Sequence, residues 1–332
     1  MKLLVTGGAG FIGSHFVRLM LRKGHRVVNL DRLTYAVAGR TDNLADVARH
    51  PRYRFIRGDI REPRTVATAI RGASAVVNFA AESHVDRSIR DAAVFLQTNI
   101  LGTQVLLDAA RRARVRRFLQ VSTDEVYGSR EGAPASETAP LAPNSPYSAS
   151  KAAADLLCRA YGVTHGLPVI ITRSTNNFGP HQFPEKLIPL FILRALRNQP
   201  LPLYGDGGQV RDWLFVEDHC EGIRRALERG RPGEIYNFGA GHGRRNRDIV
   251  RMILKMMGKP RTLIQRVQDR PGHDRRYAVT IRKAARELGW KPRRPFAEAL
   301  RETVDWYLAH PEWWRPRLAG VTLPLWARRK AG

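Results

Sequence analysis

Three observations predict an α/β fold, with a doubly wound, mostly parallel sheet followed by a smaller C-terminal α/β region. Short apolar runs of strand length alternate with stretches of helical periodicity through the first 175 residues. Such alternation is typical of βαβ units, whose parallel strands are covered on both faces. After residue 175 this regularity fades into Pro- and Gly-rich segments. We therefore expect two regions, residues 1–175 and 176–314, and a C-terminal tail of unknown role at 315–332.

The expected elements follow the chain in order. Strands are predicted where the apolar runs occur, at 2–7, 26–31, 53–59, 74–80, 117–122 and 168–174. Helices are predicted where apolar residues recur at helical spacing, at 11–24, 63–72, 89–113 and 147–164. The last two helices are long and have apolar residues to spare. These spare apolar residues lead us to expect a twofold homodimer.

Composition excludes several classes of protein. The 332 residues are 43% hydrophobic, which is enough to bury a large core. Cys158 and Cys220 lie far apart within helix-like patterns, so we predict neither a disulfide nor a metal site, and we expect a cytoplasmic protein. No apolar run approaches the ~20 residues of a membrane span, and the N-terminal run is broken by glycines too early for a signal peptide.

The formal net charge of +26 raises the question of a polyanionic partner. The densest basic cluster, "RRARVRR" at 111–117, ends a helical pattern, where positive charge is favourable anyway. No zinc-finger, RRM or helix-turn-helix pattern accompanies it. We therefore expect no nucleic-acid partner, and interpret the charge as a basic surface that attracts an acidic small substrate.

A glycine motif, "TGGAGFIG", joins the first strand to the first helix. Gly7, Gly10 and Gly13 permit a tight turn that lets backbone N–H groups approach a pyrophosphate, as in Rossmann-type dinucleotide sites. Asp31 ends the next strand, where a carboxylate can accept hydrogen bonds from both ribose hydroxyls and would repel a 2′-phosphate. NAD is therefore favoured over NADP. The guanidinium of the adjacent Arg32 could bind a 2′-phosphate, so NADP stays an alternative. Asp59 has two interpretations: contact with the adenine amino group, or a helix N-cap.

A second motif, "YSASK", places Tyr147 and Lys151 at i and i+4, on one face of a helix. An ammonium close to a phenol lowers the phenol pKa, so Tyr147 is expected to accept a proton near neutral pH. Together with Ser122-Thr123 and the glycine motif, this set resembles the extended short-chain dehydrogenase/reductase superfamily, which includes epimerases, reductases and dehydratases.

Asp124 and Glu125 follow the strand at 117–122 and favour a dehydratase. Loss of water across C5–C6 of a 4-keto sugar needs one group to take the C5 proton and another to protonate the departing hydroxyl, and two carboxyl groups in different environments can divide these roles. With "DRLTYA", "AAESHVDRSI", "NNFGPHQFPEKLIPL", "YGDGGQVRDWLFVEDH", "RPGHDRRYA" and "ELGWKP", the chain resembles the dTDP-glucose 4,6-dehydratase family to about residue 312. The competing interpretation is that the pair caps a loop.

The resemblance implies roles for individual residues. Thr123 and Tyr147 would hold the C4 hydroxyl, with Tyr147 as base and Lys151 supporting it, Asp124 as acid toward C6 and Glu125 as base at C5. The implied NAD contacts are Gly7, Gly10, Phe11, Ile12, Gly13, Asp31, Leu33, Thr34, Asp59, Ile60, Phe79, Ala80, Ala81, Thr98, Tyr147, Lys151 and Asn177. The implied contacts with the nucleotide sugar are Glu82, Ser83, Thr123, Asn176, Glu185, Lys186, Leu187, Tyr204, Arg211, Asn246, Arg270 and His273.

The chain departs from the family pattern in its C-terminal region. "NFGAGHGRRN" has His242-Gly243 where the family has an Asn-Glu pair, and "VTIRK" replaces "IDASK". These changes leave open a UDP- or other nucleotide sugar. A 4-epimerase or reductase remains the alternative enzyme, and a dinucleotide-sensing or nucleic-acid-binding protein on the same fold is the alternative outside enzymes.

Overall fold

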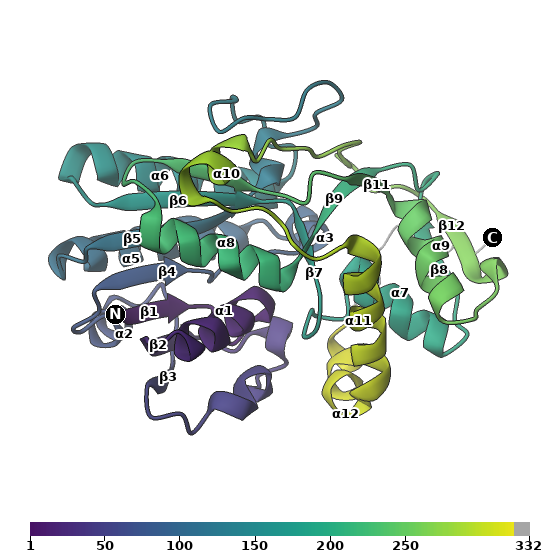
Figure 1. The fold of residues 1–332 in the computed structure, drawn as a ribbon, viewed down its shortest axis with the longest axis horizontal. Coiled ribbons are helices and arrows are strands. Elements are labelled where there is room, and N and C mark those ends of the chain that lie inside the picture. The colour runs from purple at the N-terminus through teal and green to yellow at the C-terminus, as the bar shows by residue number, and fades with distance from the viewer. Residues whose placement is uncertain (322–332) are drawn as a thin grey trace.

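A seven-stranded parallel sheet forms the centre of the molecule (Figure 1). The computed structural model describes residues 1–321. The strand order is β10-β6-β5-β4-β1-β2-β3, and every neighbouring pair runs parallel. The order reverses direction after β1, which is the arrangement of a doubly wound sheet with its ligand site at the carboxyl ends of the strands. The predicted fold class is confirmed.

The elements of the sheet and its covering helices come mostly from the first part of the chain. The strands are β1 (Lys2–Thr6), β2 (Arg26–Asp31), β3 (Tyr53–Arg57), β4 (Ala75–Asn78), β5 (Arg117–Thr123), β6 (Val169–Ser174) and β10 (Ile235–Phe238). The helices are α1 (Phe11–Arg22), α2 (Pro63–Ala69), α3 (Val85–Arg90), α4 (Ala93–Phe95), α5 (Gly102–Arg112), α6 (Pro146–His165), α8 (Val216–Arg229) and α10 (Arg282–Leu288).

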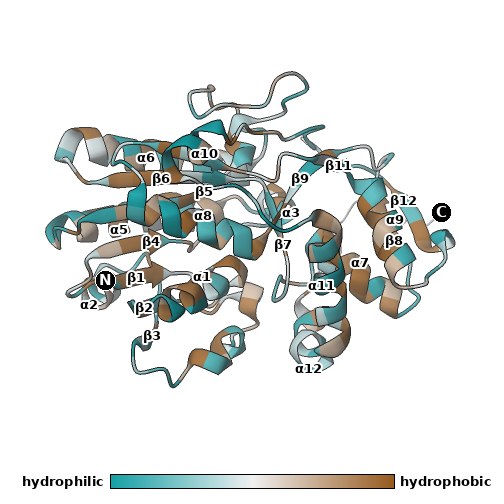
Figure 2. Cartoon of the chain, viewed as in Figure 1, coloured by the Kyte–Doolittle hydropathy of each residue, from teal (hydrophilic) through white to brown (hydrophobic). Residues whose placement is uncertain are grey.

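Helices cover both faces of this sheet. α1 and α8 lie side by side in front of it in Figure 1, while α2, α5 and α6 pack together against the other face. The strands are hydrophobic for much of their length because both faces are buried (Figure 2). α5 turns Leu106, Leu107 and Ala110 into the core, the spacing expected of an amphipathic helix. The hydrophobic periodicity of the helices thus explains why they cover both faces of the sheet.

The C-terminal region forms two smaller sheets on the right of Figure 1. Its strands are β7 (Asn176–Phe178), β8 (Leu201–Tyr204), β9 (Val210–Phe215), β11 (Gly243–Arg245) and β12 (Ile264–Val267). Its helices are α7 (Leu187–Leu196), α9 (Asn246–Met256), α11 (Phe296–Ala309) and α12 (Pro311–Trp314). The chain does not leave the large sheet for good at residue 176, because α8 and β10 return to it.

The helix expected at 89–113 is interrupted. α3 ends at Arg90, and Asp91 has an extended backbone and accepts a hydrogen bond from the Ala93 N–H at 2.9 Å. Its carboxylate therefore caps a new helix start. A π-helical segment, Leu96–Leu101, follows before α5. Such segments occur frequently at functional sites, and this one contains Thr98, which lines the cleft described below.

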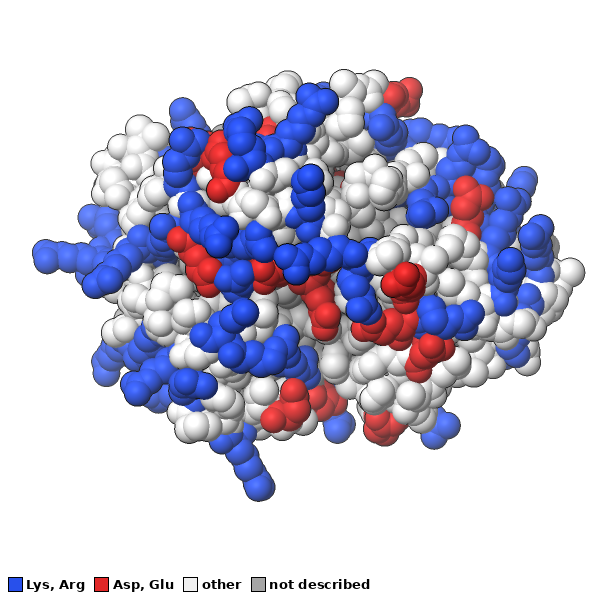
Figure 3. Space-filling view, in the orientation of Figure 1, with Lys and Arg blue, Asp and Glu red and all other residues white. Residues whose placement is uncertain are grey.

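Basic side chains are spread over the whole face drawn in Figure 3, with fewer acidic ones between them. On this face the positive charge is not confined to one stripe. Within residues 1–321, no helix is both long enough and apolar enough to cross a bilayer.

Candidate active site

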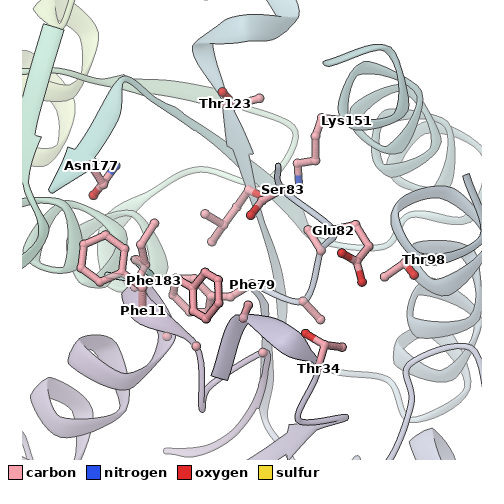
Figure 4. Close-up of a pocket in the computed structure, with 18 of the residues that line it drawn as sticks. Phe11, Thr34, Phe79, Glu82, Ser83, Thr98, Thr123, Lys151, Asn177 and Phe183 are labelled. Atoms are coloured by element: carbon pink, nitrogen blue, oxygen red, sulfur yellow. Dashed lines mark hydrogen bonds between the residues drawn. The ribbon is translucent and has the colours of Figure 1, made fainter. Parts of the chain in front are cut away.

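Two adjoining cavities open where the central strands end. The first has a volume of about 310 Å³ and extends from the glycine turn after β1 to the end of β5. Figure 4 shows this cavity, with Phe11, Phe79 and Thr34 in the lower half of the view and Thr123 and Lys151 in the upper half. The second has a volume of about 180 Å³ and lies between β5 and the C-terminal region. Both are lined by Ser83, Glu125, Asn176, Asn177, Gln182, Glu185 and Lys186, so they form one continuous cleft.

The glycine turn fits a dinucleotide. Gly7 has a φ of +68°, and a Cβ there would lie 2.6 Å from the Ala80 nitrogen. A Cβ on Gly13 would lie 2.3 Å from the Gly7 oxygen. Neither position accepts a side chain, so backbone lines the floor of the cavity in front of the α1 N-terminus. N–H groups at a helix start bind phosphate oxygens, as the motif predicted.

Asp31 lies at the end of β2 in the same cavity. Its two oxygens accept hydrogen bonds from the Ala9 and Leu33 backbone N–H groups at 2.9 and 2.8 Å. These bonds fix the carboxylate, and burial raises its pKa. Leu33 itself lines neither cavity, and its part is this backbone hydrogen bond in a left-handed turn with a φ of 59°.

Asp59 is held by arginines. Its carboxylate accepts hydrogen bonds from the Arg61 backbone and guanidinium, and Arg32 lies 3.4 Å away. The Arg61 side chain lowers the pKa of Asp59 against the effect of burial. The N-cap of α2 is Glu62, so Asp59 does not cap that helix. It lines the dinucleotide cavity beside Arg32, and Arg32 is thereby paired with a carboxylate.

Thr123, Asp124 and Glu125 end β5 and begin a short 3-10 turn. The Thr123 hydroxyl caps this turn by accepting the Glu125 N–H at 3.2 Å, and it lies 3.4 Å from Asp124 Oδ1. The cap is therefore Thr123 and not the carboxyl pair. Asp124 is 2% exposed, and its Oδ2 has no hydrogen-bond partner among the described residues. A buried carboxyl oxygen without a partner at the wall of a cleft is available to a ligand.

The two carboxyl groups have different electrostatic surroundings. Burial raises the pKa of Asp124 well above its ordinary value, and the neighbouring Glu125 raises it further. Burial also raises the pKa of Glu125, but Arg270, Arg211 and Lys186 oppose this shift. Asp124 is thus better suited than Glu125 to hold a proton, since its pKa is raised further. This division is the one that an acid and a base in the same reaction need.

Tyr147 and Lys151 lie on the first turns of α6, which starts with a capping box between Ser145 and Ser148. The expectation that Lys151 lowers the pKa of Tyr147 is not met. Lys151 Nζ donates to the Val121 carbonyl at 2.8 Å, while burial, followed by the charge of Glu125, raises the pKa of Tyr147. Ionisation of this phenol therefore requires further positive charge near it.

The second cavity holds the residues implied for nucleotide-sugar binding. Arg211 is 5% exposed and stacks 4.2 Å over the Tyr277 ring, and Arg270 pairs with Asp86 at 3.1 Å. Arg270 Nε and the side-chain oxygens of Asn176 and Asn246 are buried without partners among residues 1–321. An open guanidinium donor suits a diphosphate, and open amide oxygens suit the hydroxyl or N–H donors of a nucleotide sugar.

The structure brings most of the sequence-predicted residues into this cleft. Those lining the first cavity are Gly7, Gly10, Phe11, Ile12, Gly13, Asp31, Thr34, Asp59, Ile60, Phe79, Ala80, Ala81, Glu82, Ser83, Thr98, Thr123, Asp124, Glu125, Tyr147, Lys151, Asn176, Asn177, Glu185 and Lys186. The second cavity adds Leu187, Tyr204, Arg211, Asn246, Arg270 and His273.

Two residues that line the cleft, Tyr277 and Asp86, and one that contacts its wall, Arg87, were missed. Tyr277 donates to Asp274 at 2.6 Å and lies 3.5 Å from Glu125 Oε2. Arg87 donates to Glu185 at 2.9 Å, and Asp86 is the partner of Arg270. All three belong to motifs that support the family resemblance, "RPGHDRRYA" and "AAESHVDRSI", so the signal was present but not assigned to single residues.

Comparison with known proteins decides the family. A profile of the family described as GDP-mannose 4,6 dehydratase matches residues 4–303. A dTDP-glucose 4,6-dehydratase of Streptomyces niveus is 51% identical over 322 residues, which is 95% of each chain. The chain belongs to the dTDP-glucose 4,6-dehydratase family. A crystal structure of this dehydratase from Streptomyces venezuelae, with NAD and a second ligand bound, has 52% identity and a TM-score of 0.93, covering 96% of this chain and all of that one.

Epimerases are also similar, but less so. The UDP-glucose 4-epimerase of Thermus thermophilus, solved with NAD, has 35% identity and a TM-score of 0.86, with 93% of this chain and 99% of that chain covered. The expected extended short-chain dehydrogenase/reductase architecture is thus shared by the dehydratases and the epimerases.

The departure at His242-Gly243 lies outside both cavities. The Gly241 and His242 N–H groups donate to the Asp212 carboxylate at 3.0 and 3.1 Å, and Gly243–Arg245 form β11 beside β9. Asp212 in turn adds to the negative charge that raises the pKa of Asp124. The substituted loop therefore supports a neighbour of the acid rather than lining the cleft.

Proposed function

We propose that the protein converts dTDP-glucose to dTDP-4-keto-6-deoxyglucose and water with bound NAD. The observation that supports this most strongly is the pair Asp124 and Glu125, adjacent in one cleft, with the pKa of Asp124 raised further than that of Glu125. An epimerase has no step that needs such a pair, since it only oxidises and re-reduces C4.

The dinucleotide would be held by the glycine turn, Asp31 and the apolar walls formed by Phe11 and Phe79. When bound, NAD supplies the acceptor for the C4 hydride and returns that hydride to C6. Asp31 favours NAD over NADP, because its fixed carboxylate repels a 2′-phosphate and Arg32 is paired with Asp59.

The side chains of this chain move the protons. With bound NAD supplying the positive charge that ionisation of Tyr147 requires, Tyr147 would take the proton of the C4 hydroxyl. Together with loss of the C4 hydride to NAD, this would leave a ketone at C4 and make the C5 hydrogen acidic. Glu125 takes the C5 proton, and Asp124 gives its proton to the departing C6 hydroxyl, so that water leaves. After hydride reaches C6, Glu125 returns its proton to C5. Tyr147 then holds one extra proton and Asp124 lacks one, and the Thr123 hydroxyl, which contacts both, offers the path between them.

Arg211 and Arg270 would bind the diphosphate, since guanidinium groups offer several charged donors at once. Lys186, whose ammonium donates to the Ser83 carbonyl at 2.8 Å, and Glu185 would approach the sugar. Asn246 and His273 would lie nearer the nucleoside. A UDP-sugar is the competing substrate.

A homodimer is proposed from exposed apolar side chains on neighbouring helical elements. Leu96 and Leu101 of the π-helical segment are 46% and 57% exposed, and Leu156 and Val163 of α6 are 56% and 74% exposed. The two segments pack together, so these side chains form one surface. We place the enzyme in the cytoplasm, where the buried free thiols of Cys158 and Cys220 stay reduced.

The test is product analysis with purified enzyme and dTDP-glucose. A 4-keto-6-deoxy product without stoichiometric release of reduced nicotinamide supports the proposal. A product that retains the C6 hydroxyl would instead indicate an epimerase. DNA binding that persists at physiological salt, without turnover of any nucleotide sugar, would favour the nucleic-acid-binding alternative.

A further inference from the structure

The sequence left the C-terminal tail without a role, yet part of it is well docked. After α12, residues Arg315–Gly320 form a 3-10 turn, and Val321 lines the nucleotide-sugar cavity. We call Trp313–Val321 the C-terminal segment. It begins with the last two residues of α12, the helix labelled at the lower end of the yellow ribbon in Figure 1. Its contacts run to both halves of the cleft.

Arg317 anchors the C-terminal segment to the N-terminal region. Its side chain is 0% exposed, although a guanidinium in the last turns of a chain would ordinarily be solvated. Two of its nitrogens donate to the Asp42 carboxylate, and the guanidinium stacks 4.0 Å over the Trp313 ring. Asp42 lies 275 residues earlier in the chain. A bidentate pair with a buried guanidinium and a partly exposed carboxylate fixes the relative position of its two segments.

The side chain of Asn43 connects this anchor to the dinucleotide turn. Asn43 Oδ1 accepts the Trp313 Nε1–H at 2.7 Å and faces Arg317 Nη2 at 3.5 Å. Its amide nitrogen must then point the other way, and it donates to the Ala9 carbonyl at 2.9 Å. Ala9 belongs to the glycine turn, and its own N–H donates to Asp31 Oδ2 at 2.9 Å.

The other end of the C-terminal segment reaches the nucleotide-sugar half. The Gly320 carbonyl accepts a hydrogen bond from Arg87 Nη2 at 3.1 Å. The same nitrogen donates to Glu185 Oε2 at 2.9 Å, and the guanidinium lies 3.7 Å over the Tyr35 ring. Glu185 lines both cavities, as Glu125 does, and its side chain is 3% exposed.

We propose that the C-terminal segment is a positioning element for both ligand half-sites. Arg317 holds Asn43 so that its amide fixes the turn that carries Ala9 and Asp31, and Gly320 holds Arg87 against Glu185. The proposal rests on the dinucleotide and nucleotide-sugar sites proposed above. It assigns Arg317 to the retention of NAD, although Arg317 lines neither cavity.

The NAD side is tested with Arg317→Met in the full-length enzyme. The rate at which bound NAD exchanges with isotopically labelled NAD should rise about tenfold, the effect of losing one positioning hydrogen-bond network. Arg225→Met is the matched control, because Arg225 is also an ion-paired, part-buried arginine, and it contacts Glu221 and the end of α10 instead. Its exchange rate should equal that of the wild type.

Asn43→Asp separates the positioning of the Ala9 turn from the docking of the C-terminal segment. An aspartate keeps acceptors for Trp313 and Arg317 but cannot donate to the Ala9 carbonyl. The tryptophan fluorescence of the C-terminal segment should stay as in the wild type, while NAD exchange should accelerate as in Arg317→Met. Wild-type exchange rates in both variants would overturn the assignment. A wild-type protein that holds no NAD would instead refute the proposed function.

The nucleotide-sugar side is tested with two truncations. A chain ending at Leu318 lacks Gly320 and Val321, and a chain ending at Val321 is its reference. The shorter chain should show a KM for dTDP-glucose about tenfold higher, with kcat and the NAD exchange rate unchanged relative to the reference. Equal KM values for the two chains would contradict the role of Gly320 and Val321.

Discussion

Replacing Glu125 by Gln removes the proposed C5 base and keeps the size of the side chain. The Glu125 backbone N–H, which Thr123 caps, is unaffected, so the turn after β5 should keep its shape. Arg270, Arg211 and Lys186 remain in place to bind the substrate. The variant therefore isolates proton removal at C5 from folding and from substrate binding.

The expected loss follows from the position of Glu125. A single proton-transfer group contributes about 10²–10⁴ in rate, and Tyr277, whose hydroxyl lies 3.5 Å from Glu125 Oε2, does not replace it, because burial raises the pKa of Tyr277 above its ordinary value. Turnover should fall by about 10³. The free energy of unfolding should not fall, because the variant removes a carboxyl group that burial disfavours in its charged form.

The assay compares Glu125→Gln with Asp124→Asn. In the first variant, dTDP-glucose should produce near-ultraviolet absorbance of reduced nicotinamide on the enzyme, without exchange of the C5 hydrogen with deuterated water. In the second, C5 exchange should continue while water loss slows by a similar factor. Near-normal turnover of both variants, or equal loss of C4 oxidation in both, would refute the division of roles between the two carboxyl groups.

Three further predictions concern stability and cofactor binding. Burial raises the pKa of Asp124, so its stabilising contribution is complete below the ordinary Asp pKa of about 4 and is lost as pH rises toward the raised value; in urea unfolding, the stability of Asp124→Asn relative to the wild type should therefore increase as pH rises above about 4, and a constant difference would contradict this. Arg173→Met removes the partner of Asp155, whose side chain is 1% exposed and lies 2.9 Å from the Arg173 guanidinium. The free energy of unfolding, measured in urea, should fall by about 3–5 kcal/mol, and adding Asp155→Leu should restore part of it. Gly7→Ala places a Cβ 2.6 Å from the Ala80 nitrogen at a φ of +68°, so the purified protein should contain no bound NAD, and a full complement would refute the fit of the turn.

Local patterns in the sequence were sufficient for the sheet and for much of the cleft. The glycine turn and Asp31 follow strand ends, and the carboxyl ends of parallel strands meet at one edge, so these residues converge once the strands are found. Tyr147 and Lys151 share a helix face by spacing alone. The family, the fold class and the identity of the carboxyl pair were therefore accessible from the sequence.

Long-range pairing was not accessible in the same way. Arg87 meets Glu185 across 98 residues, and Tyr277 meets Glu125 across 152, contacts that exist only after the C-terminal region has docked. The direction of Lys151 Nζ toward the Val121 carbonyl depends on side-chain packing that spacing does not encode. The break at Asp91 was missed because the hydrophobic periodicity continues across it, while a single side-chain cap starts the new helix.

The most direct test of the account follows the hydrogen at C4. dTDP-glucose labelled with deuterium at C4 is incubated with the purified enzyme, and the product is analysed for the position of the label. The account predicts a 4-keto-6-deoxy sugar with deuterium at C6 and no net change in bound NAD, because the same cofactor takes and returns the hydride. Deuterium retained at C4, or found in free reduced nicotinamide, would contradict it.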